Sequence, residues 1–189
     1  MKLVPIVKSD LLINNVGSDE QRTYLIKEAF LRKQNTPSIN NTNDGCWRGI
    51  FKYSDIDWLI QEVESSAKYL VSYYLEKDPS YKIRLKQKTN SIDYWTNIND
   101  PGSLNRLHSH KDVDYVGLYF LQSGGTGDLI FHNPANLLTD CSDNSPFISR
   151  MIYKPKDGDL LIWPGWVPHE VEVNNSNKHR INIAFNIKL

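Results

Sequence analysis

The chain has 189 residues, of which 40% are hydrophobic and 11% aromatic, and this composition excludes a disordered protein. Lysine and arginine together number 22, as do aspartate and glutamate, so no net charge would attract nucleic acid or an anionic membrane. Cys46 and Cys141 are too few for a disulfide scaffold. Since no apolar run has the length of a signal-peptide core or a membrane span, we expect one soluble, cytoplasmic domain.

The first part of the chain predicts two helices. Ser18 and Gln21 have the spacing of a capping box, and the apolar residues behind them repeat every three to four positions. A longer apolar stripe starts after Ser54 and ends before Pro79, because proline cannot continue a helix. We therefore expect residues 1–79 to form a helical support region.

Beyond Pro79 the apolar pattern changes from a period of 3.6 to a period of 2, which predicts strands. With one earlier edge strand, the predicted strands are residues 3–7, 83–85, 94–98, 104–110, 116–121, 129–131, 151–153, 159–163, 170–173 and 181–187. Asp100-Pro101-Gly102 predicts a turn between the third and fourth of them. Because no helix separates the later strands, we expect an antiparallel α+β fold, mainly β, with a barrel or sandwich core formed by residues 80–189. The polar segment from Asn133 to Ser149 predicts a long loop beside the substrate entrance.

Histidines and one carboxylate form the candidate metal site. His108 and His110 lie two positions apart, so a strand would place both imidazoles on one face, and Asp112 continues this alternation. His169 follows a proline-bracketed turn and would supply a distal ligand. Imidazole and carboxylate ligands with open coordination positions suit a non-haem Fe(II) oxygenase. Two ligand sets are open: His110, Asp112 and His169, or His108, His110 and His169.

An arginine follows the distal histidine at a spacing that would let it bind a carboxylate near the metal. Arg180 lies eleven residues after His169, and Asn182 shares its face of the predicted strand. A guanidinium can hold one carboxylate of a 2-oxo dicarboxylic acid in a bidentate fork while the other end chelates the metal. Other candidates are assigned to the surface (His132, His179) or to the core (Trp95, Trp163).

Several short motifs occur in a specific order from Gly45 to the C-terminus. They are Gly45-Cys46-Trp47-Arg48, Trp95-Thr96-Asn97, Asn105-Arg106-Leu107-His108-Ser109-His110, Gly117-Leu118-Tyr119-Phe120-Leu121, Gly127 to Pro134, Gly158-Asp159-Leu160 with Pro168-His169, and Arg180 to Asn186. In this order the chain resembles the 2-oxoglutarate/Fe(II)-dependent oxygenases, and especially the small oxygenases of phages and marine bacteria. The resemblance implies a double-stranded β-helix, jelly-roll or cupin-like, with two N-terminal helices packed on it.

The resemblance also implies a dioxygenase, in particular a hydroxylase, that uses Fe(II), 2-oxoglutarate and O2 and releases succinate and CO2. It favours His110, Asp112 and His169 as ligands, because a carboxylate lowers the net charge at Fe(II) and matches the wider superfamily, although relatives usually have a small residue in place of Asp112. His108 would then lie behind the ligands or face the substrate. Arg180 and Asn182 would bind 2-oxoglutarate, with Tyr119 as a further hydrogen-bond donor to its carboxylate.

Two other functions compete with this one. His108 and His110 followed by Asp114 loosely match the first motif of a cupin-type metal enzyme, which would need no 2-oxoglutarate. The chain could also be a non-catalytic β-barrel module of viral or binding function. For an oxygenase we expect a protein side chain or a small molecule as substrate, with no nucleic-acid or membrane partner, and the sequence allows a homodimer. A phage-encoded chain would act in the host cytoplasm.

Overall fold

The computed structural model describes residues 9–39, 44–77, 91–134 and 150–189, which hold two helices and nine strands. The elements are β1 (Leu12–Asn15), α1 (Asp19–Asn35), β2 (Asp44–Gly49), α2 (Tyr53–Lys77), β3 (Ser91–His108), β4 (Tyr115–Gln122), β5 (Leu129–His132), β6 (Arg150–Tyr153), β7 (Asp159–Pro164), β8 (His169–Val171) and β9 (Arg180–Lys188). The predicted strands at residues 3–7 and 83–85, and most of the predicted loop from Asn133 to Ser149, lie outside the described residues.

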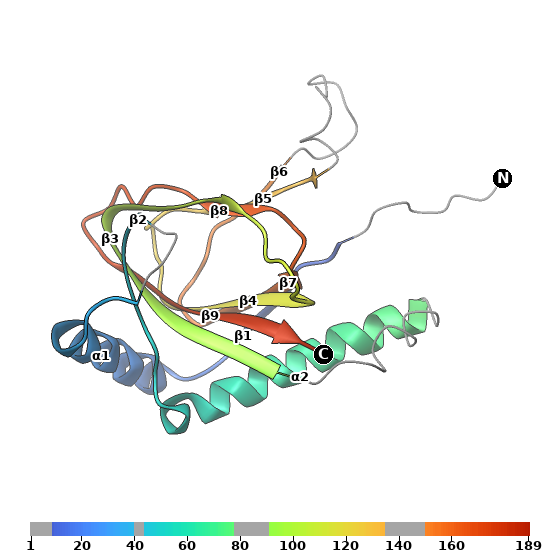
Figure 1. The fold of residues 1–189 in the computed structure, drawn as a ribbon, viewed down its shortest axis with the longest axis horizontal. Helices are drawn as coiled ribbons and strands as arrows, with labels where there is room; N and C mark the ends of the chain where they lie inside the picture. Colours follow the sequence, from blue (N-terminus) through green and yellow to red (C-terminus); the bar gives the residue numbers. More distant parts are fainter. Residues whose placement is uncertain (1–8, 40–43, 78–90, 135–149) are drawn as a thin grey trace, which may run out of the picture.

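The strands form one antiparallel sheet that curls over on itself into two layers (Figure 1). Its order is β1-β7-β4-β9-β3-β8-β5-β6, and β2 pairs separately with β3. One layer holds β1, β7, β4, β9 and the first part of β3, whereas the end of β3, β8, β5 and β6 form the other. The predicted mainly β architecture is confirmed, and the two facing layers are those of a double-stranded β-helix.

Strand β3 belongs to both layers. The sequence predicted two strands separated by a turn at Asp100-Pro101-Gly102, but the structure has one strand of 18 residues. Gly102 adopts a positive φ of 83°, which glycine tolerates at no steric cost, and its amide donates to the Asn174 carbonyl at 2.8 Å. The chain therefore bends from one layer into the other without ending, and it carries His108 to the far side of the barrel.

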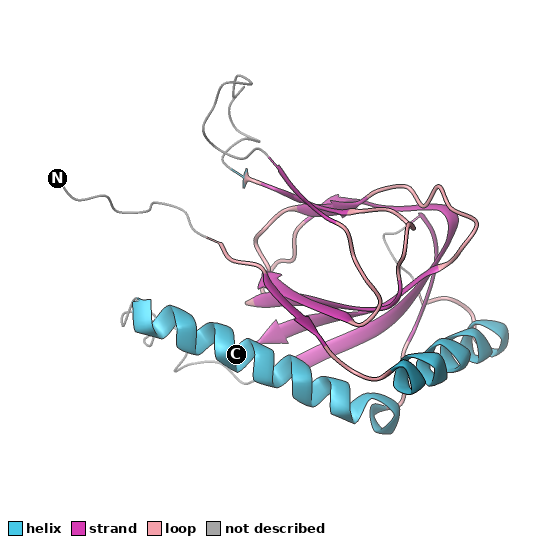
Figure 2. Ribbon diagram, turned by 180° about the vertical axis from the view of Figure 1, so that it is seen from behind, coloured by secondary structure: helices cyan, strands magenta, loops and turns pink. Residues whose placement is uncertain are grey.

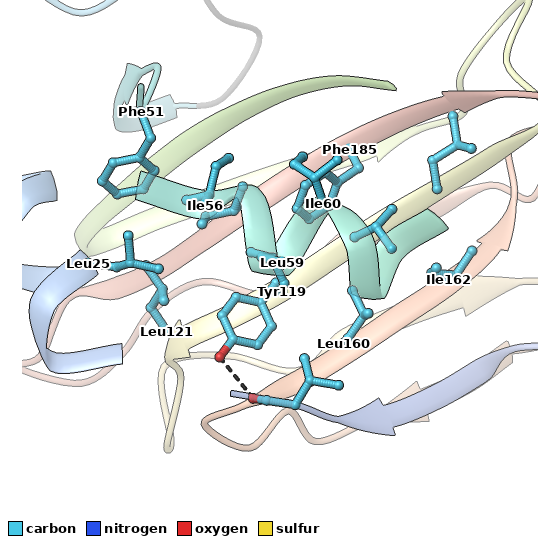
Figure 3. Close-up of a cluster of buried hydrophobic side chains, with 14 of the residues drawn as sticks. Leu25, Phe51, Ile56, Leu59, Ile60, Tyr119, Leu121, Leu160, Ile162 and Phe185 are labelled. Atoms are coloured by element: carbon cyan, nitrogen blue, oxygen red, sulfur yellow. Dashed lines mark hydrogen bonds between the residues drawn. The ribbon is translucent and has the colours of Figure 1, made fainter. Parts of the chain in front are cut away.

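Both predicted helices are confirmed. Ser18 and Gln21 form the expected capping box at the start of α1, and α2 ends at Lys77. The helices lie against the outer face of the β4–β9–β3 layer (Figure 2). Apolar side chains of α2, among them Ile56, Leu59 and Ile60, pack there against the sheet (Figure 3). Neither described helix combines the length and apolar character needed to span a membrane.

Strand β9 separates two environments by simple alternation. Its residues Ile181, Ile183, Phe185 and Ile187 join the apolar core beneath the helices. The intervening positions Arg180, Asn182, Ala184 and Asn186 therefore face the interior of the barrel. A second apolar cluster, which includes Phe131, Trp163 and Val171, fills part of that interior. The polar row on β9 is the feature that positions the site described next.

Candidate active site

Three histidines converge at one end of the barrel. His108 ends β3, His169 begins β8, and the two residues are partners across the β3–β8 ladder. His110 follows β3 by two residues. The ring centroids are 4.4 Å apart for His108 and His169 and 5.4 Å apart for His110 and His169. One ring nitrogen from each residue lies within 4.8 Å of the others, a grouping that could hold a metal ion.

The same ring nitrogen, Nδ1, makes a hydrogen bond in all three histidines. Nδ1 of His108 lies 2.7 Å from the Arg106 carbonyl, and Nδ1 of His169 lies 3.0 Å from the Val167 carbonyl. Nδ1 of His110 lies 2.7 Å from Oδ1 of Asn186. Because these partners are oxygen acceptors, each Nδ1 carries the hydrogen and donates it. The neutral tautomer leaves the Nε2 lone pairs of all three rings available to a metal.

Burial favours the neutral form of His169 and His110. The pKa of His169 is lowered to about 3, mainly by burial and to a smaller extent by the neighbouring His108 and His110, against the opposing effect of the Val167 carbonyl. Burial also lowers the pKa of His110, while its bond to Asn186 partly offsets this. Since metals bind the unprotonated imidazole, these shifts favour metal binding at neutral pH.

Asp112 lies apart from the histidines. It is exposed on the turn after His110, and its backbone φ is +57°. The prediction that Asp112 shares a face with His110 requires an extended chain, but β3 ends at His108 and Asp112 lies on a turn. The structure brings together the alternative set of three histidines.

A cavity of about 220 Å³ opens beside the three histidines. Besides His108, His110 and His169, its lining residues are Arg48, Trp95, Asn97, Asn105, Val116, Leu118, Val171, Ala184 and Asn186. The lining thus combines an apolar wall with amide groups and one cation, and it contains no carboxylate among the residues that the structure describes.

Arg180 lies further along the inward face of β9. Its side chain is buried, with 1% of its surface exposed, and Nη1 donates to the Thr126 carbonyl at 2.6 Å and the Glu172 carbonyl at 3.4 Å. A β-carbon at Gly127 would lie 3.0 Å from that Nη1, so glycine leaves room for the guanidinium. Burial lowers the pKa of Arg180 to about 10, which still leaves it charged at neutral pH.

Two donors of Arg180 remain free within the part of the chain that the structure describes. Nε and Nη2 are buried and have no hydrogen-bond partner. Asn182, the next inward residue of β9, accepts a bond from Nδ2 of Asn97 at 2.9 Å, and Asn97 lines the cavity. A buried guanidinium with free donors is costly unless an anion pairs with it. Its position is therefore suited to a carboxylate.

Tyr119, predicted to bind the co-substrate, lies on the helix side of the sheet and does not line the cavity. Its hydroxyl donates to the Val16 carbonyl at 3.0 Å on the helix side of the sheet (Figure 3). Its ring packs edge-on against Trp58 of α2, with centroids 5.8 Å apart. Val116 and Leu118 line the cavity from the same strand, so alternation turns Tyr119 to the opposite face.

Other predictions for single residues have mixed outcomes. Trp163 is buried in the interior core, and its ring contacts His169 edge-on at 4.9 Å. Trp95 was assigned to the core but lines the cavity, where the Arg48 guanidinium carbon lies 4.8 Å from its ring centroid. His132 and His179 lie away from the cluster, paired with Glu170 and Asp100 respectively.

Sequence reasoning gave no role to four polar lining residues of this site, Arg48, Asn97, Asn105 and Asn186, although each lies in a motif that it noted. Of these, Asn186 orients His110. A signal existed for Asn186, which shares the face of Arg180 and Asn182 on a correctly predicted strand.

The family comparison agrees with this geometry. The family model described as "Putative 2OG-Fe(II) oxygenase" matches residues 93–186, which include the three clustered histidines and Arg180. The chain belongs to the 2-oxoglutarate/Fe(II)-dependent oxygenases. No curated protein matches the sequence of this oxygenase.

Solved structures share the fold of the oxygenase at low identity. A prolyl-4-hydroxylase from Pseudomonas putida is 14% identical with a TM-score of 0.63, and the match covers 95% of this chain and 91% of that one. HygX from Streptomyces hygroscopicus, solved with nickel and 2-oxoglutarate, is 11% identical with a TM-score of 0.58, covering 94% and 82%. A Trichoplax adhaerens prolyl hydroxylase, in complex with a hypoxia-inducible-factor peptide, is 14% identical with a TM-score of 0.58 and the same coverage.

The metal and co-substrate of the family fit the residues present. Three neutral imidazoles with free Nε2 atoms form a nitrogen donor set that leaves coordination positions open. The unpaired Nε and Nη2 of Arg180 offer two donors to a carboxylate inside the barrel. The oxygenase therefore has Fe(II) and 2-oxoglutarate as its metal and co-substrate, with O2 as oxidant.

Proposed function

We propose that the oxygenase is a hydroxylase in which His108, His110 and His169 hold Fe(II). The observation that carries this ligand set is the common state of the three rings, whose Nδ1 atoms all donate to oxygen acceptors. Asp112, exposed on its turn, is then not a ligand. When bound, Fe(II) and 2-oxoglutarate supply O2 activation coupled to oxidative decarboxylation of the co-substrate.

Arg180 and Asn182 form the co-substrate end of the proposed site. Arg180 binds the distal carboxylate of 2-oxoglutarate through Nε and Nη2, while its Nη1 stays anchored to the Thr126 carbonyl. Asn182, held by Asn97, supports the co-substrate from the same face. The remaining lining residues exclude water and orient the substrate carbon toward the metal.

Hydroxylation is the reaction that the named neighbours favour, since two of them are prolyl hydroxylases. The substrate is a protein side chain or a small molecule, because structures of this fold include one in complex with a peptide and one with hygromycin B bound. A cytoplasmic location and a division of the chain at residues 79 and 80 stay predictions.

The proposed ligand set is tested by paired variants. Under anaerobic conditions, Fe(II) and 2-oxoglutarate should give the visible charge-transfer band of the metal chelate. His108→Ala should weaken Fe(II) binding by more than the about 10–100-fold that is typical for residues behind the ligands. Asp112→Ala is the matched control and should leave Fe(II) affinity unchanged. The reverse order would restore the carboxylate set, and no chelate band in the wild type would contradict the oxygenase function.

A further inference from the structure

Strand β2 brings a cation, Arg48, to the wall of the cavity. Arg48 pairs in register with Asn97, and the bulky side chain of the preceding Trp47 is buried in the core beneath the helices. Because neighbouring strand residues face opposite ways, Arg48 points into the barrel, where it lines the cavity with the three histidines. The guanidinium carbon lies 4.8 Å from the centroid of the Trp95 ring, a cation–π contact that holds it in place.

Among the described residues, no anionic side chain pairs with the Arg48 guanidinium. Its Nε is buried and has no hydrogen-bond partner there. Burial lowers the pKa of Arg48, but a guanidinium remains charged at neutral pH. A buried N–H donor without an acceptor costs stability, and the cation–π contact with Trp95 does not supply an acceptor. The arrangement is explained if a ligand supplies the missing anion.

The charge of the loaded site leads to the same conclusion. Three neutral imidazoles cancel none of the charge of a divalent metal ion, and the described lining contains no carboxylate. The dianion 2-oxoglutarate balances only part of the combined charge of the metal, Arg180 and Arg48. Its distal carboxylate is already matched to Arg180, the more deeply buried of the two arginines.

We propose that Arg48 binds a carboxylate of the primary substrate, so that the oxygenase acts on a carboxylic acid. This inference rests on the proposed function, because it places the substrate beside the metal and assigns 2-oxoglutarate to Arg180. The planar guanidinium can accept a carboxylate in a bidentate fork while it remains stacked on Trp95. Arg48 is then the substrate-binding residue that selects acids over their neutral amides.

Acetate is the probe for this inference, with acetamide as its uncharged counterpart. The 189-residue protein is loaded anaerobically with Fe(II) and saturating 2-oxoglutarate, and binding of 13C-acetate is followed by paramagnetic broadening of its signal. Wild type should bind acetate and not acetamide. Arg48→Gln should weaken acetate binding by about 10- to 100-fold, the scale of a charged hydrogen bond. Arg150→Gln removes one charge from the exposed strand β6 and should change nothing.

A second variant keeps the inference testable if Arg48→Gln does not fold. Arg48→Lys keeps the charge but loses the bidentate fork, so its acetate affinity should lie between those of the wild type and Arg48→Gln. Where only Arg48→Lys folds, its loss of acetate affinity relative to the wild type supports the inference. Equal acetate affinity in the wild type and the folded Arg48 variants, or no acetate binding by the wild type, would overturn the inference. Loss of 2-oxoglutarate affinity in Arg48→Gln would overturn it too, since Arg48 would then bind the co-substrate. A wild type that never binds 2-oxoglutarate would contradict the proposed function itself, and the inference would fall with it.

Discussion

The two faces of the β4–β9–β3 layer have opposite chemistry. Toward the helices the layer is mainly apolar, and the hydroxyl of Tyr119 has a backbone partner in Val16. Toward the interior β3 holds Asn99, β9 holds Arg180 and the neighbouring β2 holds Arg48, each with a buried side-chain atom that lacks a hydrogen-bond partner among the described residues. Unpaired buried polar groups cost stability, and native proteins retain them mainly at functional sites. The outer face therefore stabilises the fold, and the inner face is built for ligands.

The largest effect is expected from a change on the outer face. Phe185 is fully buried between the sheet and the helices, and Phe185→Ala should lower the free energy of unfolding by about 3–5 kcal/mol. Urea denaturation measures the loss. The folded fraction should still bind Fe(II) and 2-oxoglutarate with wild-type affinity, because Phe185 points away from the cavity. A larger effect on ligand affinity than on stability would show that the two faces are not separate.

Acid should lower the stability of the metal-free protein through His169 on the inner face. The pKa of His169 is about 3 in the folded protein and about 6.5 in a free chain, so the unfolded state binds more protons between these values. The stability present above pH 6.5 is therefore lost progressively as the pH falls toward 3. Thermal unfolding of the metal-free protein at a series of pH values measures this loss. His169→Phe should show a shallower pH dependence, and an equal slope would exclude His169 as its source.

A change at Arg180, on the inner face, should affect ligand binding. Arg180→Lys keeps the charge but loses the bidentate fork, so 2-oxoglutarate binding should weaken by about 1.5–3 kcal/mol. Fe(II) affinity should change little, because Arg180 is not a metal ligand. Both constants can be measured anaerobically on one preparation. Unchanged 2-oxoglutarate affinity would remove Arg180 from the co-substrate site.

A change at Tyr119 should have the smallest effect, and it should lower stability without weakening 2-oxoglutarate binding. Tyr119→Phe removes the hydrogen bond to the Val16 carbonyl and should cost about 0.5–1.5 kcal/mol of unfolding free energy. Because Tyr119 faces the helices, its loss should leave the dissociation constant of 2-oxoglutarate unchanged. Titrations of the variant and the wild type, run side by side, measure that constant. Weaker co-substrate binding would return Tyr119 to the site.

Much of the fold was predictable where one local signal was strong. The capping box of Ser18 and Gln21 gave the start of α1, and Pro79 gave the end of α2 to within two residues. Strands β1 and β2 were missed, since β1 is short and largely exposed and β2 begins with Asp44-Gly45, a pair more typical of turns. The bend at Gly102 was taken for a turn, because sequence alone does not show whether a strand resumes in another layer.

The site was predictable in its residue types and less so in its geometry. The spacing of His108, His110, Asp112 and His169 contained both ligand sets, but a positive φ at Asp112 is uncommon for a non-glycine residue and invisible in the pattern. Tyr119 lies on a strand that is buried on both faces, so apolar alternation gives no orientation there. The place of Arg48 in the site was not predicted, because its neighbours in space come from β3, about fifty positions later in the chain.

The proposed metal site, made only of imidazoles, has a consequence for metal selectivity. Nitrogen donors bind first-row divalent ions in the order Fe(II), Co(II), Ni(II), Cu(II), with Zn(II) below Cu(II) but well above iron. The cluster of His108, His110 and His169 adds no anionic oxygen donor that would favour the harder ion. Occupancy by iron must then follow from which metals the cell supplies, and protein isolated in the presence of nickel or zinc should carry those ions until a chelator removes them.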